Sequence, residues 1–163
     1  MKRVTAPAGR VEEVRRLFAA ATAVTARAVF HAKAASVLLL DEGAGDLVFA
    51  AVAGEGAELL LGSRISTTTG IAGSVVASGK AEVIANVAAD ERFAHHIAEA
   101  IGYVPAEMMA APLVSQGRPL GVIEVLDRPQ FSHFSTVELD LLRLIAEQAA
   151  IAFAALTEAE LRS

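Results

Sequence analysis

The sequence contains no cysteine. Without a thiol, the chain cannot attack a substrate through a thiolate or hold a cofactor through a thioether bond. It also has no apolar run near the roughly 18 to 20 residues that cross a bilayer, although 54% of its residues are hydrophobic and its mean hydropathy is +0.48. Residues 1–10 lack the apolar core of a secretory signal. These absences argue against a membrane span and favour a cytoplasmic location.

Basic residues are few, since 14 Lys and Arg stand against 19 Asp and Glu, which gives a net charge of −5. A protein that binds nucleic acid needs a clustered basic surface to neutralise phosphates. One segment is locally basic and carries Arg10, Arg15 and Arg16, but Glu12 and Glu13 are interleaved with these arginines. We interpret it as a solvated helix face, and we expect no nucleic-acid partner.

Length and apolar content together predict a single domain that associates with itself. A chain of 163 residues buries about two-thirds of the surface that its unfolded form exposes, and no second core is expected. A monomer of this size seldom leaves large apolar patches in water. The excess of apolar residues therefore predicts a homodimer.

The first third of the chain predicts a helix followed by two strands. Apolar side chains recur at intervals of three and four, as on one face of a helix. They are Val11, Val14, Leu17, Phe18, Ala21 and Val24. Two apolar runs, residues 34–41 and 46–52, follow and are separated by a glycine-containing turn. The first run is almost continuously apolar, which indicates that both faces of the sheet are covered. A three-layer arrangement is predicted.

The middle of the chain predicts two short helices with a strand between them. Hydroxyl side chains in residues 66–69 can cap a helix over residues 71–78. Residues 81–85 form a predicted strand, and Asp90 can cap a second helix over residues 91–101. A glycine follows each helix and can end it.

A tight hairpin and a long helix complete the chain. Apolar runs over residues 108–114 and 120–127 flank Gln116-Gly117, which can supply the left-handed backbone of a hairpin turn. The last helix is predicted to open at Ser135, with Glu138 completing a capping box. It is apolar on two faces, one of which can pack on the sheet. The other has the spacing of a helix–helix seam, about 3.5 residues, and is the predicted dimer interface. Its residues are Leu141, Leu144, Gln148, Ile151 and Ala155.

Several local motifs follow one another in a recognisable order. They are Gly70-Ile71-Ala72-Gly73, the segment 86–93, Pro112-Leu113, Gly121-Val122-Ile123, and a phenylalanine followed by an acidic residue at the start of the last helix. In order and spacing they resemble the GAF family over residues 11–156. The resemblance implies an α/β protein of the α+β type with a central antiparallel sheet of about six strands. Terminal helices would pack on one face, and short helices and loops would form a small-molecule pocket on the other.

The resemblance also divides the chain into three parts. Residues 1–10 would be a flexible N-terminus, residues 11–156 a single GAF-like domain, and residues 157–163 a C-terminal extension of the last helix. This extension keeps its helical character and carries no stop signal. We expect it to lead to an output segment of a longer signalling protein or to a partner.

Members of the family differ in the reaction they catalyse or the ligand they bind, and the residues of this chain argue against most of these activities. Members that reduce free methionine sulfoxide use a thiolate, and phytochrome-like members usually hold a bilin through cysteine, so thiolate catalysis and a covalent bilin are both excluded. Haem-binding members use a histidine just before the strand that corresponds to residues 108–114. Residues 101–109 contain no histidine, so haem is not expected.

Cyclic-nucleotide-binding members often carry Asn-Lys, then a phenylalanine, then Asp-Glu. The corresponding residues here are Asp127-Arg128, Phe134 and Glu138-Leu139. Most of these are only similar, and Leu139 departs outright. A cyclic nucleotide is therefore a less favoured ligand.

The adjacent histidines His95 and His96 raise the hypothesis of a metal site. Only His95 shares a helix face with Glu91 and Glu99, at intervals of four residues. A solvated helix face explains these residues better, and no metal site is predicted.

The resemblance implies a set of ligand contacts on the pocket side of the sheet. They are Thr67, Thr69, Ile71, Asn86, Phe93, Tyr103 and Met108. Glu124 is a separate candidate because it lies in mid-strand between Ile123 and Val125, where an unpaired carboxylate would cost several kcal/mol. It must therefore find a partner or face water. An arginine or a helix end is the more expected partner, and a donor group of a ligand is the alternative.

Two functional hypotheses follow. No activated nucleophile or acid–base pair can be identified, so no catalytic residues are predicted and an enzyme is not expected. The first hypothesis is a sensory domain that binds a small molecule and transmits its occupancy through the terminal helices in signal transduction. The alternative is a ligand-free dimerisation module whose pocket is filled by its own side chains. The sequence does not name the ligand.

Overall fold

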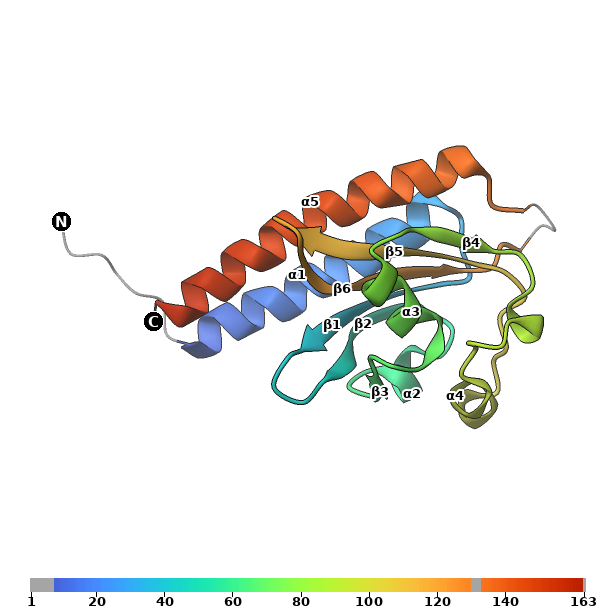
Figure 1. The fold of residues 1–163 in the computed structure, drawn as a ribbon, viewed down its shortest axis with the longest axis horizontal. Coiled ribbons are helices and arrows are strands. Elements are labelled where there is room, and N and C mark those ends of the chain that lie inside the picture. The colour runs from blue at the N-terminus through green and yellow to red at the C-terminus, as the bar shows by residue number, and fades with distance from the viewer. Residues whose placement is uncertain (1–7, 130–132, 163) are drawn as a thin grey trace.

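The computed structural model describes residues 8–129 and 133–162 (Figure 1). In these ranges the chain forms six strands, five α-helices and one short 3-10 helix. In chain order they are α1 (Ala8–Val29), β1 (Ala34–Asp41), β2 (Asp46–Gly54), α2 (Ala57–Leu60), β3 (Arg64–Ser66), α3 (Gly70–Ser78), β4 (Glu82–Ile84), η1 (Val87–Ala89), α4 (His95–Ile101), β5 (Met108–Ser115), β6 (Arg118–Leu126) and α5 (Thr136–Leu161). Part of the predicted N-terminal segment is thus helical, because α1 begins at Ala8, and α5 continues into the predicted extension.

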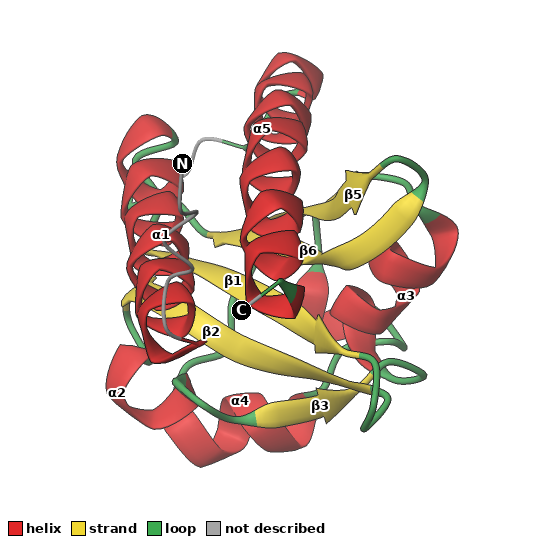
Figure 2. Cartoon of the chain, turned by 90° about the vertical axis from the view of Figure 1, so that its left-hand side faces the viewer, coloured by secondary structure: helices red, strands yellow, loops and turns green. Residues whose placement is uncertain are grey.

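The strands form one sheet in the order β3-β2-β1-β6-β5-β4, and each pair of neighbours is antiparallel. α1 and α5 lie side by side over one face of this sheet, and α2, α3 and α4 lie on the other side (Figures 1 and 2). We call the first the helix face and the second the ligand face. The predicted α+β architecture, with about six antiparallel strands between two layers, is confirmed.

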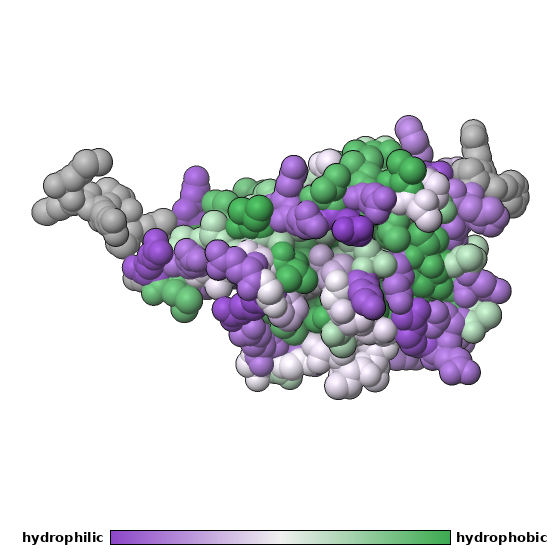
Figure 3. Space-filling model, turned by 45° about the horizontal axis from the view of Figure 1, so that its top comes forward, coloured by the Kyte–Doolittle hydropathy of each residue, from purple (hydrophilic) through white to green (hydrophobic). Residues whose placement is uncertain are grey.

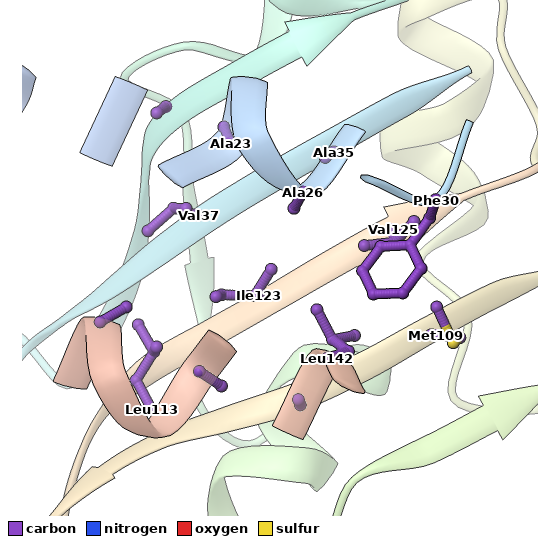
Figure 4. Close-up of a cluster of buried hydrophobic side chains, with 14 of the residues drawn as sticks. Ala23, Ala26, Phe30, Ala35, Val37, Met109, Leu113, Ile123, Val125 and Leu142 are labelled. Atoms are coloured by element: carbon purple, nitrogen blue, oxygen red, sulfur yellow. The ribbon is translucent and has the colours of Figure 1, made fainter. Parts of the chain in front are cut away.

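Each face of the sheet buries its own apolar cluster. On the helix face, Val37, Ile123 and Val125 pack with side chains of α1 and α5 (Figure 4). On the ligand face, Leu38 and Val122 pack with side chains of α3 and the neighbouring strands. Adjacent residues of a strand thus serve opposite clusters, which explains the almost continuous apolarity of β1 and confirms that both of its faces are covered.

The buried side of α1 differs from the apolar stripe that the sequence displays. The helix lies on the sheet through small side chains and one large one. These are Ala19, Ala23 and Ala26 of the helix and Phe30, which follows its last residue, Val29. Within the stripe, Val14, Leu17 and Val24 are 38%, 53% and 60% exposed. Alanine lets the helix axis approach the strands closely, so the larger apolar residues are left on the outer side.

α5 carries two stripes, as predicted. Its buried stripe packs on the sheet and consists of Leu142, Ala146, Ala149, Ala150 and Phe153. All five residues of the predicted dimer seam, from Leu141 to Ala155, are exposed. Green hydrophobic patches lie among hydrophilic residues on this side of the molecule (Figure 3). In the two described ranges, no helix is long and apolar enough to cross a membrane.

Two predicted helix caps are wrong. Thr69 stands at the N-cap of α3, but its side chain makes no capping hydrogen bond there. Asp90 does not cap α4, which begins at His95, four residues later than the predicted helix. The Asp90 carboxylate instead accepts hydrogen bonds from the backbone and side chain of Arg92. The Asp90 carboxylate is thus bound by Arg92 and does not serve as a helix cap.

The turn and cap that frame the C-terminal half are confirmed. Gln116 and Gly117 have φ angles of 50° and 75°, which is the left-handed geometry of a tight hairpin turn. Ser135 accepts a hydrogen bond from the backbone of Glu138, and Glu138 accepts one in return from the backbone of Ser135. This capping box fixes the start of α5.

Candidate ligand site

The ligand face has an apolar floor with an uneven cover. α3 packs against β3, β5 and β6, whereas α4 makes little contact with the strands. Of the predicted contacts, Ile71 and Met108 are 4% and 3% exposed and belong to the apolar cluster of this face. Phe93 packs at the edge of the same cluster. The structure therefore brings the three apolar candidates together.

Three of the four polar candidates have hydrogen-bond partners within the loops of the protein. The hydroxyl of Thr67 donates to the carbonyl oxygen of Gly45 at 3.0 Å. The hydroxyl of Thr69 donates to the carbonyl oxygen of Ser66 at 3.5 Å. The side-chain oxygen of Asn86 caps η1 and accepts from the backbone of Ala89 at 3.3 Å. These bonds give each side chain a local structural role, and ligand contact by these residues stays a prediction.

Tyr103, the fourth polar candidate, belongs to a buried hydrogen-bonded cluster around Asp127. Its hydroxyl donates to one carboxylate oxygen of Asp127 at 2.6 Å. The other carboxylate oxygen accepts from the backbone of Ala106 and Glu107, both at 2.9 Å. Burial and this carboxylate hold the pKa of Tyr103 far above its usual value. Asp127 itself has a φ of 53°, so the cluster stabilises an unusual backbone conformation that joins β6 to the loop before β5.

Arg128, Phe134 and Glu138 come together just beyond this cluster. Arg128 forms an ion pair with Glu138 and lies over the ring of Phe134, 4.8 Å from its centre. The contacts fasten the end of β6 to the start of α5. They give the residues that resemble the cyclic-nucleotide motif a structural role and supply no observation in favour of that ligand.

Arg92 has a comparable structural role at the edge of the ligand face. Its guanidinium pairs with Asp90 and Glu82, each at 2.8 Å, and donates to the hydroxyl of Ser74 at 3.1 Å. The first of these partners contributes most to raising the pKa of Arg92 above its usual value, and Arg92 in turn lowers the pKa of Asp90. These bonds connect α3, β4 and the segment before α4.

The histidines of α4 lie outside a metal-binding geometry. Because α4 begins at His95, Glu91 precedes the helix and does not share its face. The ring of His95 packs edge-on against Phe93, with 4.8 Å between the ring centres. Across the described part of the chain, no three His, Asp or Glu side chains are grouped to hold a metal ion.

Glu124 and Ser36 are the polar residues of the ligand face that lack partners. Ser36 of β1 lies directly opposite Glu124 of β6 in the sheet register. Ser36 is 1% exposed, and its hydroxyl has no hydrogen bond within the described structure. Glu124 is partly buried and also has no hydrogen bond or ion pair among the described residues, so the expected arginine or helix-end partner is wrong. Burial raises the pKa of Glu124 to about 7.

Sequence reasoning identified Glu124 but missed Ser36. The serine is the one polar residue within the run Ala34–Leu40, and only the register with β6 shows that it faces a carboxyl group. The sequence did carry a signal, because each of the two strands has a polar residue within an apolar run. These two residues could have been considered as a cross-strand pair. The two strands are separated by almost the whole domain in sequence, however, so their register was not predictable from local pattern.

Two surface depressions lie away from this pair. One, of about 620 Å³, follows β4 and is lined by Asn86, Arg92 and Leu139, among others. The other, of about 1480 Å³, lies where α1 and α5 extend past the sheet, and it is lined by residues such as Leu39, Leu120 and Ala154. Asn86 is the predicted contact that lines the first. Both are open surface features, and the first adjoins the edge of the ligand face at Arg92.

Comparison with known proteins identifies the fold. The sequence model of the GAF domain matches residues 15–153. The GAF domain of a phosphoenolpyruvate-protein phosphotransferase from Coxiella burnetii is 22% identical with a TM-score of 0.75, and the match covers 91% of this chain and 86% of that one. The second GAF domain of DevS from Mycobacterium smegmatis is 17% identical with a TM-score of 0.74, covering 91% and 99%.

One similar structure is an enzyme. Free methionine-R-sulfoxide reductase from Neisseria meningitidis, solved in complex with its substrate, is 24% identical with a TM-score of 0.66, and the match covers 89% of this chain and 86% of that one. The likeness at this identity concerns the fold alone. The fold thus occurs also in a free methionine-R-sulfoxide reductase.

Proposed function

Since this chain belongs to the GAF domain family, we propose that it is a non-enzymatic sensory domain that binds a small molecule on its ligand face. The observation that carries the proposal is a pair of facing polar residues on that face, the buried Ser36 hydroxyl and the partly buried Glu124 carboxyl, neither of which has a partner among the described residues. Polar groups inside an apolar layer destabilise a fold unless something satisfies them. Their retention is explained if a ligand supplies the missing hydrogen bonds.

Strand β6 offers a direct route from the ligand face to the terminal helices. Val122 belongs to the ligand-face cluster, whereas Ile123 and Val125, on either side of Glu124, belong to the cluster beneath α1 and α5. A ligand that prefers one position of β6 would favour one packing of Leu142 and Phe30 against it. Such a preference between two arrangements is what transmission of occupancy requires.

The absence of catalysis is part of the proposal. The chain has no thiol, and in the described structure the Ser36 hydroxyl makes no hydrogen bond to Glu124 or to another group that could activate it. A binding role in the cytoplasm agrees with both this chemistry and the predicted location. Signal transduction is the setting in which a domain of this family would use it.

Native mass spectrometry of gently purified protein tests the proposal. We expect the protein to retain a small molecule, or to acquire one from a cell extract, and we expect Ile71→Trp to prevent this by filling the ligand face. Leu144→Trp, which places the same side chain on the exposed side of α5, is the matched control and should keep the added mass. Protein that carries no added mass before or after exposure to the extract would contradict the proposal.

A second candidate function, dimerisation without a ligand, is favoured by the exposed apolar stripes. α1 exposes Leu17 and Val24, and α5 exposes Leu144 and Ile151 at 56% and 66%. A second copy of the chain could bury these side chains in a helix bundle. Light scattering should report a dimer for the wild type and a monomer for Leu144→Glu with Ile151→Glu. Arg143→Glu, an exposed charge change on the same helix, should remain dimeric.

A further inference from the structure

The strongest unexplained feature of the molecule is the position of Glu124 at the centre of the ligand face. In the register of the sheet, Glu124 lies between Ser36 of β1 and Ala110 of β5. Directly opposed side chains in an antiparallel sheet have Cβ atoms about 5 Å apart. The hydroxyl of Ser36 is therefore close to the Glu124 carboxyl in the sheet, although the two make no hydrogen bond in the described structure. A small residue, Ala110, lies on the other flank.

Among the described residues, no basic side chain pairs with this carboxyl. β1 between Ala34 and Leu40, β5 and α3 contain no titratable residue, and on α4 the titratable residues His95, His96 and Glu99 are exposed. Burial is the one cause of the raised pKa of Glu124, so no neighbouring charge contributes. Arg92, the cation at the edge of this face, pairs with Asp90 and Glu82 instead. Glu55 and Asp127 are negative and act on Tyr103.

The environment of Glu124 indicates which charge a ligand at this site would carry. An anionic ligand would place a second negative charge beside the Glu124 carboxylate. A neutral ligand could satisfy hydrogen bonds but would not stabilise the ionised carboxylate. A cation stabilises it through both charge and hydrogen bonds. Val122 and Met108 beside the site belong to an apolar cluster, so the rest of the ligand should be apolar.

We propose that the ligand is a small apolar molecule with an ammonium group, and that this group binds the Glu124 carboxylate while the Ser36 hydroxyl donates to the same carboxylate. This inference rests on the proposed sensory function and specifies the ligand of that site. A carboxylate can accept several hydrogen bonds, and an ammonium group has three donors. Ser36 acts as a positioning residue, because it holds the carboxylate in place and does not itself need to touch the ligand.

Binding includes a proton transfer whose balance can be measured. In the free protein below pH 7, Glu124 carries a proton on its carboxyl group. When the ammonium ion binds, this proton leaves for solvent, and the product is a carboxylate paired with the unchanged ammonium ion. Affinity should therefore fall about tenfold for each pH unit below 7 and become constant above about pH 8. Calorimetry in buffers with different ionisation enthalpies reports the released proton directly.

The test uses the full chain and three probes of similar shape. These are phenylpropylammonium, the neutral 3-phenylpropanol and the anionic 3-phenylpropionate. By calorimetry at pH 8, we expect the ammonium probe to bind at least tenfold more tightly than the alcohol, and the anion to bind most weakly. Glu124→Gln should reduce the ammonium affinity to that of the alcohol. Glu99→Gln, the same change at an exposed carboxyl, should have no effect.

The proposed role of Ser36 must be tested by a measurement that would not change if the residue only supported the fold. With carboxyl-labelled glutamate, NMR should show that a saturating ammonium probe lowers the pKa of Glu124 by at least one unit in the wild type. In Ser36→Ala this decrease should be smaller, and the pH midpoint of binding should move upward. Ser36→Thr keeps the hydroxyl and should restore both values. An unchanged midpoint in Ser36→Ala would overturn the role of Ser36.

The outcomes separate this inference from the function on which it rests. If the ammonium probe binds no better than the alcohol, or if Glu124→Gln leaves its affinity unchanged, the cation site is overturned. Binding of the neutral or anionic probe that is lost in Ile71→Trp would then still support a sensory ligand face. If none of the three probes binds and native mass spectrometry with cell extract also finds no added mass, both proposals fail.

Discussion

The two faces of the sheet differ in how fully they are covered by helices and in whether their polar side chains have partners. On the helix face, the buried cluster is apolar throughout and is closed by two long helices. On the ligand face, the cover consists of short elements, and the buried Ser36 and the partly buried Glu124 have no partner within the described ranges. The same strands contribute to both faces, so local sequence cannot account for the contrast. One face secures the fold, and the other retains unsatisfied groups at a cost in stability.

The largest expected effect lies on the helix face. Leu142 is fully buried there, whereas its neighbour Leu141 is 42% exposed. We expect Leu142→Ala to lower the free energy of unfolding by about 3 kcal/mol, because it leaves a cavity in a closed core. Leu141→Ala should change it by less than about 0.5 kcal/mol in the monomer. Urea unfolding at low protein concentration measures both, and equal losses would contradict the assignment of the two stripes.

On the ligand face, in contrast, a substitution at Glu124 should raise the free energy of unfolding. The pKa of Glu124 is raised from 4.5 to about 7 in the folded protein, so the folded state holds this proton more tightly than the unfolded state. Stability from this residue is therefore fully present below about pH 4.5 and is lost as the pH rises through 7. Glu124→Gln keeps the shape without the charge. We expect it to stabilise the protein by about 2 kcal/mol at pH 8, after allowance for the buried amide.

The pH dependence provides the control for this effect. At pH 4.5 the wild-type carboxyl is protonated in the folded state, so Glu124→Gln should have little effect on stability there. The exposed Glu99 gives a matched substitution, because Glu99→Gln should leave the pH profile unchanged. Urea unfolding at several pH values supplies both profiles. A constant difference between Glu124→Gln and the wild type at all pH values would show that the carboxyl is not buried as described.

Tyr103 should contribute to stability even without a ligand. Its hydroxyl donates to Asp127 at 2.6 Å, so Tyr103→Phe leaves a carboxylate oxygen of Asp127 without this donor. We expect a loss of about 1.5 kcal/mol in the ligand-free protein. Tyr103 is also the sole tyrosine, and its pKa is raised well above the usual value. Absorbance at 295 nm should therefore show no tyrosinate at about pH 11 while the protein is folded, and normal ionisation in urea.

Local signals predicted the frame of the domain better than its ligand face. The hairpin at Gln116-Gly117 and the capping box at Ser135 depend on residues close together in the chain, and both predictions are confirmed. The partner expected for Glu124 and the cap expected of Asp90 depend on which distant side chains arrive nearby, and both predictions are wrong. The α1 stripe shows a third limit. Periodicity found the helix, but alanine, which carries little hydrophobic signal, forms its buried side.

The smallest expected effect concerns the hairpin that serves both faces. Gln116 has a φ of 50°, a conformation that costs most residues free energy but that asparagine adopts readily. Gln116→Asn should raise the free energy of unfolding by about 0.5 kcal/mol, as measured by urea unfolding. Because β5 and β6 contribute to both clusters, this gain should be independent of pH and of any ligand. Gln116→Val, which is branched at Cβ, should destabilise the same turn. A pH-dependent gain in Gln116→Asn would mean that the hairpin and Glu124 are coupled, and the two faces would then not be energetically separate.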